Sequence, residues 1–298
     1  MTQLTSIHRS AIGLLLALAG FLVVPAVAGA APSSAEVASD GILDVLASGD
    51  SAPHTINVSF SGGYAISDSA GVNGGSGCAQ TTATSVFCTG GSGALAMGTG
   101  AGADRITIAS VSPTATSDSF TTATGILSGG GNDTIVGSPA SDLIIAGDGN
   151  DTIDGGLGPD QIDGRQGIDT VTYANRPASE PVTVRFESNP DDPSAQFLPS
   201  GSNGGAEGDS PDVENVIGTP GDDTIIGYRQ HSVTVYPSGS ANTFIGGAGN
   251  DNLLGVSGPD RLVGGPGKDK LIGGQGNDRC IGGSGKDRAK QCERKKSI

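Results

Sequence analysis

The sequence predicts an all-β solenoid, a fold in which short strands stack in successive coils, and two observations lead to this prediction. The first is a nine-residue repeat, G-G-x-G-x-D-x-U-x with U a large apolar residue, which runs five times without a break from Ser128 to Thr172 and five times from Gly246 to Lys290. The second is the composition: only 35% of the 298 residues are hydrophobic, 4% are aromatic and tryptophan is absent. A conventional globular core would be hard to fill with these residues, whereas each coil of a solenoid needs only a few inward side chains.

Each position of the repeat has its own physical task. Glycine at positions 1, 2 and 4 allows the positive φ angles of a tight turn, which residues with a Cβ resist. Isolated units in the same register lie at Thr99–Thr107, with Asp104 and Ile106, and at Gly218–Ile226, with Asp223 and Ile225. Position 8 is expected to supply the narrow core, and in the two arrays it is occupied by Ile135, Ile144, Ile153, Ile162, Val171, Leu253, Leu262, Leu271, Cys280 and Ala289.

Position 6 is aspartate in every unit of both arrays and in the isolated unit 218–226. The candidate metal ligands are therefore Asp133, Asp142, Asp151, Asp160, Asp169, Asp223, Asp251, Asp260, Asp269, Asp278 and Asp287. If two nonapeptides form one coil, equivalent aspartates stack about 4.8 Å apart, as Asp133 on Asp151 and Asp169, or Asp251 on Asp269 and Asp287. Stacked carboxylates repel each other, and a hard cation that takes about six to eight oxygen ligands, such as calcium, would turn that repulsion into a bridge.

Two alternatives to calcium follow from the same residues. Zinc is a poorer fit, because it prefers imidazole and thiolate ligands and only His54 and His231 follow the N-terminal segment. The aspartates could instead cap the turn backbone through side-chain hydrogen bonds, with no ion. Asparagine would cap a turn equally well, so aspartate at every array position favours calcium. The unit Gly137–Ile145 is the weakest candidate, because Pro139 and Ala140 replace residues on which the turn depends.

These nonapeptides resemble the repeats of the RTX family, the hemolysin-type calcium-binding proteins. The resemblance implies that G-G-x-G-x-D is a turn and x-U-x a short strand. It also implies that two nonapeptides make one coil of a right-handed parallel β-roll, and that several calcium ions bind in the turns. RTX proteins often show an excursion before an E-N-V-I-G segment, which here is Glu214–Gly218.

The regions outside the arrays divide the chain further. Residues 1–30 are predicted to be a secretory signal peptide, since Arg9 precedes an apolar run from Ala11 to Val27 and small residues follow. Residues 31–51 are predicted to be a linker with one helical turn near Ile42–Leu46, and residues 52–127 a short β-rich start of the solenoid. The first array then spans 128–172, a strand and loop excursion 173–217, with its strand at Val182–Phe186, the second array 218–290, and a basic tail 291–298. Val233, Val235 and Phe244 are further core candidates.

Export fits the remaining features. An oxidising compartment would allow the four cysteines to pair as Cys78–Cys88 and Cys280–Cys292, the pairs that are near in sequence. No stretch after the signal peptide is long and apolar enough to span a bilayer. The sequence therefore predicts a secreted, extracellular protein.

The charge distribution bears on partners. A net charge of −15 and a pI near 4.3 argue against nucleic acid as a general partner and fit a protein that binds cations. Lys268, Lys270, Arg279, Lys286 and Arg288 flank the aspartates of the second array and are predicted to be solvated charges at its rim. The basic C-terminal end is expected to be a solvated, frayed end, and the alternative is that it contacts an anionic cell-surface or matrix polymer or lipid headgroups.

The sequence predicts a non-enzymatic protein. It contains no H-E-x-x-H and no G-x-S-x-G motif. The function expected is a calcium-binding surface, matrix or adhesion module. The alternative is an RTX-associated extracellular enzyme that acts on polysaccharide, for which a carboxylate pair could come from Glu187, Asp191 and Asp192 in the excursion.

Overall fold

The computed structural model describes residues 32–38, 42–47, 51–89, 94–111, 124–158, 160–185, 210–212, 215–226 and 241–296. These residues form strands and turns without helices, so none of them forms a helix that could cross a membrane. The chain divides into two compact units, 1–167 and 168–298. The predicted signal peptide and the core candidates Val233 and Val235 lie outside the described residues.

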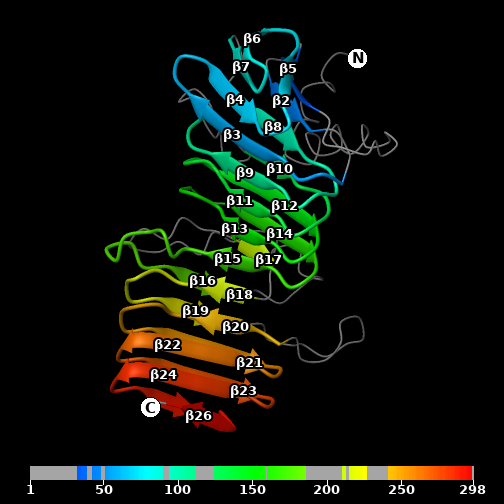
Figure 1. Cartoon of the computed structure of the whole chain (residues 1–298). Helices are drawn as coiled ribbons and strands as arrows, with labels where there is room; N and C mark the ends of the chain where they lie inside the picture. The colour runs from blue at the N-terminus through cyan, green and yellow to red at the C-terminus, as the bar shows by residue number, and fades with distance from the viewer. Residues whose placement is uncertain are drawn as a thin grey trace, which may run out of the picture. The chain divides into compact units, whose positions relative to one another are not determined.

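Unit 1 consists of two sheets whose later strands are parallel and whose earlier strands include antiparallel pairs (Figure 1). In one sheet β1 pairs with β2 antiparallel, whereas β2, β8, β10, β12 and β14 follow one another in parallel. In the other, β3, β9, β11 and β13 are parallel, and β3, β4, β7 and β6 pair antiparallel. The strands are β1 (Ser33–Val37), β2 (Leu43–Leu46), β3 (Thr55–Phe60), β4 (Tyr64–Asp68), β5 (Val72–Gly74), β6 (Cys78–Thr82), β7 (Ser85–Cys88), β8 (Leu95–Gly98), β9 (Arg105–Ile108), β10 (Thr124–Leu127), β11 (Thr134–Val136), β12 (Asp142–Asp148), β13 (Thr152–Asp154) and β14 (Gln161–Gln166).

The prediction of a linker and a helical turn in residues 31–51 is wrong. The structure instead places β1 and β2 in the sheet, with the side chains of Ala35, Leu43 and Val45 fully buried. The small residues of Ser33–Val37 give a weak hydrophobic signal, yet every second side chain of β1 faces inward at its start. A segment whose composition is typical of a linker thus forms strands of the solenoid.

Unit 2 consists of parallel strands that stack coil upon coil (Figure 1). One sheet has the order β15, β18, β20, β22, β24, β26, and the other the order β16, β19, β21, β23, β25. The strands are β15 (Thr170–Thr172), β16 (Thr183–Arg185), β17 (Ser210–Asp212), β18 (Asn215–Ile217), β19 (Thr224–Ile226), β20 (Thr243–Ile245), β21 (Asn252–Ser257), β22 (Arg261–Gly267), β23 (Lys270–Gln275), β24 (Arg279–Gly285), β25 (Arg288–Lys290) and β26 (Arg294–Lys296).

The register confirms that two nonapeptides form one coil. Asn252 pairs with Lys270 and Lys270 with Arg288, so equivalent residues are two repeats apart. Thr134 pairs with Thr152 in the same way within unit 1. The excursion after Thr172 contains β16, as predicted, and Thr170 then pairs with Asn215, so the chain returns to register after it. The fold is the expected parallel β-roll.

The core is the row of position-8 side chains. Ile135, Ile153, Leu253 and Leu271 are fully buried, and Phe244 occupies the same row with no exposed surface. Only Ala289, in the last array unit, is partly exposed. Each coil therefore contributes one or two large side chains, which explains how a chain so poor in hydrophobic residues can fold.

The turns require glycine for two different reasons. In the two arrays, except in unit 137–145, positions 2 and 4 have positive φ, for example 121° at Gly265 and 157° at Gly267. Arg165 and Val256 occupy position 2 with positive φ as well, a conformation that residues with a Cβ adopt at a cost. Position 1 does not have positive φ, contrary to the sequence-based expectation, and its glycine serves another purpose that involves the neighbouring aspartate.

Both expected disulfides form. Cys78 and Cys88 join β6 to β7, while Cys280, in the core row of β24, joins Cys292 in the C-terminal segment. Part of the predicted tail is strand β26, which pairs with β24, so that Arg279 lies opposite Arg294. The disulfide and this pairing hold the last described segment against the final coil.

Candidate metal centre

The position-6 aspartates face into the turns. Ten of the eleven predicted ligands have at most 2% of their surface exposed, and Asp287 is half-buried. In each ladder the backbone N–H of one aspartate donates to Oδ1 of the aspartate in the next coil. The distances are 2.8 Å from Asp133 to Asp151, 2.9 Å from Asp142 to Asp160 and from Asp251 to Asp269, 2.8 Å from Asp223 to Asp251 and from Asp260 to Asp278, and 3.0 Å from Asp269 to Asp287. The ladder fixes one oxygen of each carboxylate.

The second carboxylate oxygen is different. Oδ2 is buried without a hydrogen-bond partner in six of these residues, namely Asp133, Asp251, Asp260, Asp269, Asp278 and Asp287. In four of them, Asp251, Asp260, Asp269 and Asp278, it lies so close to the position-1 glycine of its own turn that a Cβ on that glycine would overlap it. Position 1 is glycine in these turns because the carboxylate occupies the space of a side chain.

In two turns, residues of the same turn donate hydrogen bonds to both carboxylate oxygens of the position-6 aspartate. The backbone N–H of Ser138 donates to Oδ2 of Asp142 at 2.5 Å, and the Ser138 hydroxyl donates to Oδ1 at 2.7 Å. Thr219 makes the same two bonds to Asp223, at 2.6 and 2.9 Å. Both units carry a hydroxyl residue at position 2, followed by proline. Hydrogen bonding of the turn by aspartate, the ion-free alternative, therefore describes these two units well.

A second ladder runs outside the first and in the opposite direction. The Asn250 N–H donates to Oδ1 of Asp222 at 2.7 Å, and the Lys268 N–H donates to Oδ1 of Asn250 at 3.0 Å. In unit 1 the Asn150 N–H donates to Oδ1 of Asn132 at 2.9 Å. Position 5 thus ties successive turns together at the surface and leaves the carboxylates of position 6 enclosed.

Burial raises the pKa of these carboxyl groups, because it removes the charged form from water. The pKa of Asp133, Asp251 and Asp260 rises to about 7, and neighbouring carboxylates add to the effect: Asp104 and Asp151 on Asp133, Asp223 and Asp269 on Asp251, and Asp278 on Asp260. Burial also raises the pKa of Asp223, Asp269 and Asp278. Without a cation, the turns therefore disfavour the negative charge that their sequence supplies.

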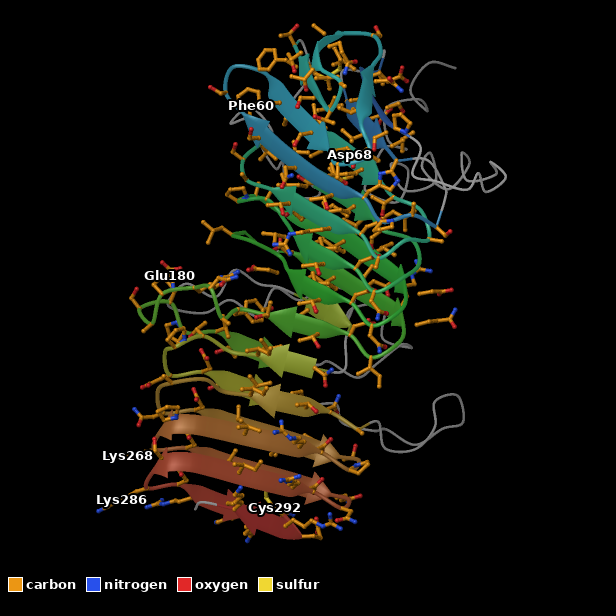
Figure 2. All side chains as sticks on the ribbon, viewed as in Figure 1. Phe60, Asp68, Glu180, Lys268, Lys286 and Cys292 are labelled. Atoms are coloured by element: carbon orange, nitrogen blue, oxygen red, sulfur yellow. A yellow bond between two sulfur atoms is a disulfide. The ribbon has the colours of Figure 1, made fainter. Side chains whose placement is uncertain are left out.

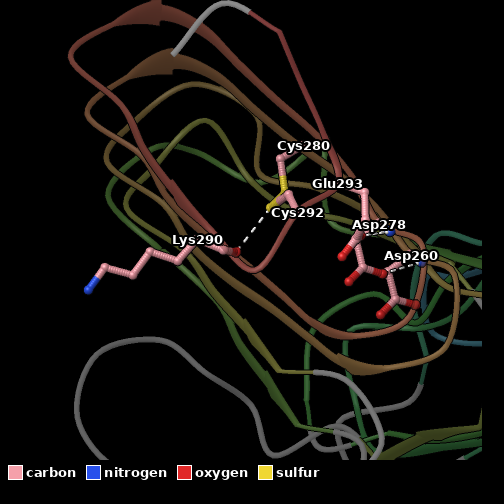
Figure 3. The surroundings of a disulfide bond; sticks show 6 residues. All are labelled: Asp260, Asp278, Cys280, Lys290, Cys292 and Glu293. Atoms are coloured by element: carbon pink, nitrogen blue, oxygen red, sulfur yellow. Dashed lines mark hydrogen bonds between the residues drawn. A yellow bond between two sulfur atoms is a disulfide. The ribbon is translucent and has the colours of Figure 1, made fainter.

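The ladders end on residues that the repeat pattern does not contain. Glu293 replaces the next aspartate at the C-terminal end: its Oε2 accepts the Asp278 N–H at 2.5 Å, so that Asp260, Asp278 and Glu293 form a row beside the Cys280–Cys292 disulfide (Figure 3). Glu293 is 15 residues from Asp278 rather than 18, which is why the spacing did not identify it. Asn242 and Val182 begin the ladders of unit 2, where they donate their N–H to Asp260 and Asp223.

His54 begins the ladder of unit 1. Its N–H donates to Oδ1 of Asp104 at 2.7 Å, and its Nδ1 lies 2.8 Å from Oδ2 of Asp68, with both side chains buried. Burial alone would raise the pKa of Asp68, but hydrogen bonds from His54, Ser33 and the Ala70 N–H hold it below its usual value. A histidine–carboxylate pair therefore occupies the first coil, where later coils have stacked aspartates. Asp104 belongs to the ladder although it was not among the predicted ligands.

These residues fit a hard cation. Oxygen atoms that are buried, anionic when ionised and without hydrogen-bond partners are the ligands that calcium prefers. Among the described residues no three His, Cys, Asp or Glu side chains converge on one point. A cation in a turn would accordingly take only one or two of its ligands from aspartate. Most of its ligands would be backbone carbonyl groups, in which these turns are rich.

The other predicted features are placed as follows. The side chains of Lys268, Lys270, Arg279, Lys286 and Arg288 are all exposed and make no ion pair with a described residue. The catalytic candidates Glu187, Asp191 and Asp192 lie outside the described residues. A hollow of about 270 Å³ between β3, β4, β7 and β9 has no carboxylate, imidazole or thiol in its lining.

Comparison with known proteins agrees with the repeat geometry. A family model described as RTX calcium-binding nonapeptide repeat (4 copies) matches residues 127–162, 139–171, 210–230, 236–255 and 254–289. These segments contain every predicted ligand. No curated protein matches the chain.

The approach of Asp160 to Gly155 gives a first prediction. A Cβ on Gly155, at position 1, would overlap Oδ2 of Asp160, whereas Gly130, at position 3, has only ordinary contacts and no positive φ. We expect Gly155→Ala to lower the free energy of unfolding by about 1–3 kcal/mol, as overpacking does, and Gly130→Ala to change it little. Urea unfolding of both variants measures this, and equal effects would contradict the close approach.

The raised pKa values predict a pH dependence of the metal-free protein. The folded state binds protons at Asp133, Asp251 and Asp260 with a pKa of about 7, while the unfolded chain has the ordinary value near 4. The stability that these protons contribute is complete below about pH 4 and is lost as the pH rises through about 7. In chelator the free energy of unfolding should therefore be higher at pH 5 than at pH 8. Asp260→Asn should flatten this dependence, and an unchanged slope would refute the assignment.

Proposed function

Because the chain belongs, through its residues 127–289, to the RTX calcium-binding nonapeptide repeat family, we propose that it is a secreted protein whose β-roll folds around several calcium ions. It is a calcium-binding RTX-type protein. In this proposal it acts outside the cell, without catalysis, as a surface, matrix or adhesion module. The single observation that carries the proposal is the row of buried Oδ2 atoms without hydrogen-bond partners.

The proposed ligands are the aspartates of the open turns, those without a hydroxyl residue at position 2. They are Asp133, Asp151, Asp160, Asp169, Asp251, Asp260, Asp269, Asp278 and Asp287. Asp142 and Asp223 were predicted alongside them, but Ser138 and Thr219 already satisfy their carboxylates. We therefore assign these two a weaker role in binding the ion. Carbonyl groups of the turns would complete the ligand set.

Calcium would act as a folding ligand. A cation that binds the folded chain alone adds about 1.4 kcal/mol of stability per site when its free concentration is about ten times the dissociation constant. Extracellular sites typically have dissociation constants of about 10⁻⁴–10⁻³ M, which calcium outside a cell can satisfy. Several such sites, each of which also removes repulsion between stacked carboxylates, could decide whether the chain folds.

Two features support an extracellular location. The first is the signal-like segment 1–30 in the sequence. The second is the pair of disulfides, which form and persist in oxidising compartments. The family model that matches the chain describes a calcium-binding repeat, which supports a non-enzymatic role over that of an RTX-associated enzyme that acts on polysaccharide.

A calcium titration of residues 31–298 tests the proposed function. Circular dichroism should show β-structure that increases with calcium, because bound ions offset the repulsion and burial of the carboxylates. Magnesium should act far more weakly, since it requires a rigid octahedral shell and gives up water reluctantly. A β signal that is complete in chelator and unaffected by calcium would refute the proposal.

Variants locate the response in the turns. Asp269→Ala removes a carboxylate that joins two neighbouring coils, and we expect it to raise the calcium midpoint roughly tenfold or more. Asp148→Ala is the matched control, because Asp148 is an exposed position-3 aspartate in a turn of the same kind. Asp142→Ala should fall between the two. If Asp148→Ala and Asp269→Ala have equal effects, position 6 is not the ligand row.

Export has its own test. Full-length chain produced with its N-terminal segment in a secreting host should be recovered outside the cytoplasm, with a new N-terminus between residues 28 and 32, since small residues surround Ala28. Sequencing of the mature N-terminus measures this. Retention of Met1 in a cytoplasmic product would contradict secretion by this route.

A further inference from the structure

The second unit separates its charges between the turn interior and the outer surface. Residues 261–296 contain four acidic side chains, of which Asp269 and Asp278 are buried and Asp287 is half-buried, while the exposed Glu293 accepts the Asp278 N–H. The same segment contains ten basic side chains, all exposed, and none of them makes an ion pair with a residue that the structure describes. They are Arg261, Lys268, Lys270, Arg279, Lys286, Arg288, Lys290, Arg294, Lys295 and Lys296.

The basic residues form rows along the stack of coils. Strand register places Arg261 opposite Arg279 and Arg279 opposite Arg294 on β22, β24 and β26. Neighbouring strands lie about 4.8 Å apart, so each coil adds one guanidinium group to the row. On the other sheet Lys270 lies opposite Arg288.

More basic side chains continue these rows toward the turns. Lys268 and Lys286 project from one edge of the unit in successive coils (Figure 2). Lys290 extends away from the coil (Figure 3). The exposed surface of the last coils is therefore basic on both sheets, and we call it the basic face.

The fold does not require these charges. Position 7, which holds Arg261, Arg279, Lys270 and Arg288, is threonine at β11, β13, β15 and β19. Threonine is a good strand residue and brings no repulsion, whereas like charges opposite each other on neighbouring strands destabilise a sheet. A stack of unpaired cations therefore calls for anionic groups from another molecule.

We propose that the basic face binds a linear polysaccharide that carries carboxylate or sulfate groups, which lies along the rows of cations. This rests on the proposed function, because a matrix or surface module would meet such polymers. Guanidinium groups bind carboxylate and sulfate through paired hydrogen bonds, and one cation per coil suits a chain with charges at short, regular intervals.

Charge and composition favour polysaccharide over nucleic acid and membrane. Phe244 is the only aromatic residue in the sequence from 241 onward, and it is fully buried. The basic face thus offers no ring on which a nucleic acid base could stack, and no Trp or Tyr that would anchor it at a lipid interface. The basic face can therefore recognise a ligand only by the negative charge of its groups and the spacing between them.

Heparin, a linear polysaccharide with both sulfate and carboxylate groups, is a suitable probe. Isothermal titration of the full chain in saturating calcium should show binding that weakens as sodium chloride rises, because salt screens exposed charges. Neutral dextran of similar length should not bind. Tighter binding to single-stranded DNA or to vesicles of phosphatidylserine than to heparin would overturn the proposal, as would no binding to heparin.

A matched pair of double variants tests the position. Arg261→Gln with Arg279→Gln removes two adjacent cations of the row, and Arg105→Gln with Arg165→Gln removes two exposed cations of unit 1. We expect the first pair to weaken heparin binding about tenfold or more and the second to change it little. Equal losses would refute the basic face as the binding site.

The experiment separates this proposal from the preceding one. Circular dichroism of each variant in calcium reports whether the β-roll has formed. If the calcium response is intact and heparin does not bind, the basic face is refuted and the calcium-dependent β-roll stands. If the calcium response is absent, the proposed function fails, whatever the polysaccharide does.

Discussion

The structure depends on one constraint: the turns enclose carboxylates, and in six of the described turns one carboxylate oxygen has no hydrogen-bond partner. Oδ1 of Asp269 accepts the N–H of Asp251, and Oδ2 is buried against Gly264 with no partner. A buried carboxylate without full hydrogen bonding is costly, and neighbouring carboxylates in adjacent coils increase that cost. A repeat that imposes this arrangement many times needs either protons or cations in its turns, and outside a cell near neutral pH calcium is the more abundant of the two.

The glycines follow from the same constraint. Positions 2 and 4 are mostly glycine because most turns have positive φ there, and where position 1 is glycine, as at Gly246 and Gly264, the carboxylate lies where a Cβ would be. Where position 2 is Ser138 or Thr219, the hydroxyl and N–H of that residue satisfy the aspartate within the turn. The repeat thus has two physical solutions to one problem, an open turn that leaves an oxygen for a cation and a closed turn that does not.

The sequence alone was sufficient to predict the features of the fold that depend on the nine-residue period. The β-roll, the pairing of residues two repeats apart and the buried row at position 8 follow from nine-residue spacing, because stacking requires equivalent residues to coincide. It was insufficient where a contact lies outside the period. Glu293 reaches Asp278 from 15 residues away, His54 and Asp68 pair through a hairpin, and the small residues of β1 resemble a linker until β2 pairs with them. The closed turns at Ser138 and Thr219 depend on side-chain geometry that the aspartate pattern does not contain.

The distribution of charged residues along the chain is more informative than the net charge. The net charge is −15, yet in residues 261–296 three of the four acids are buried or half-buried in the turns, whereas all ten bases are exposed. A calcium ion bound in a turn would cancel negative charge at residues next in sequence to exposed bases, such as Asp269 between Lys268 and Lys270. Occupied turns would therefore raise the positive potential of the outer rows as well as hold the coils together. Cation binding inside the solenoid and anion binding outside it are in this way two consequences of one charge separation, and the first would strengthen the second.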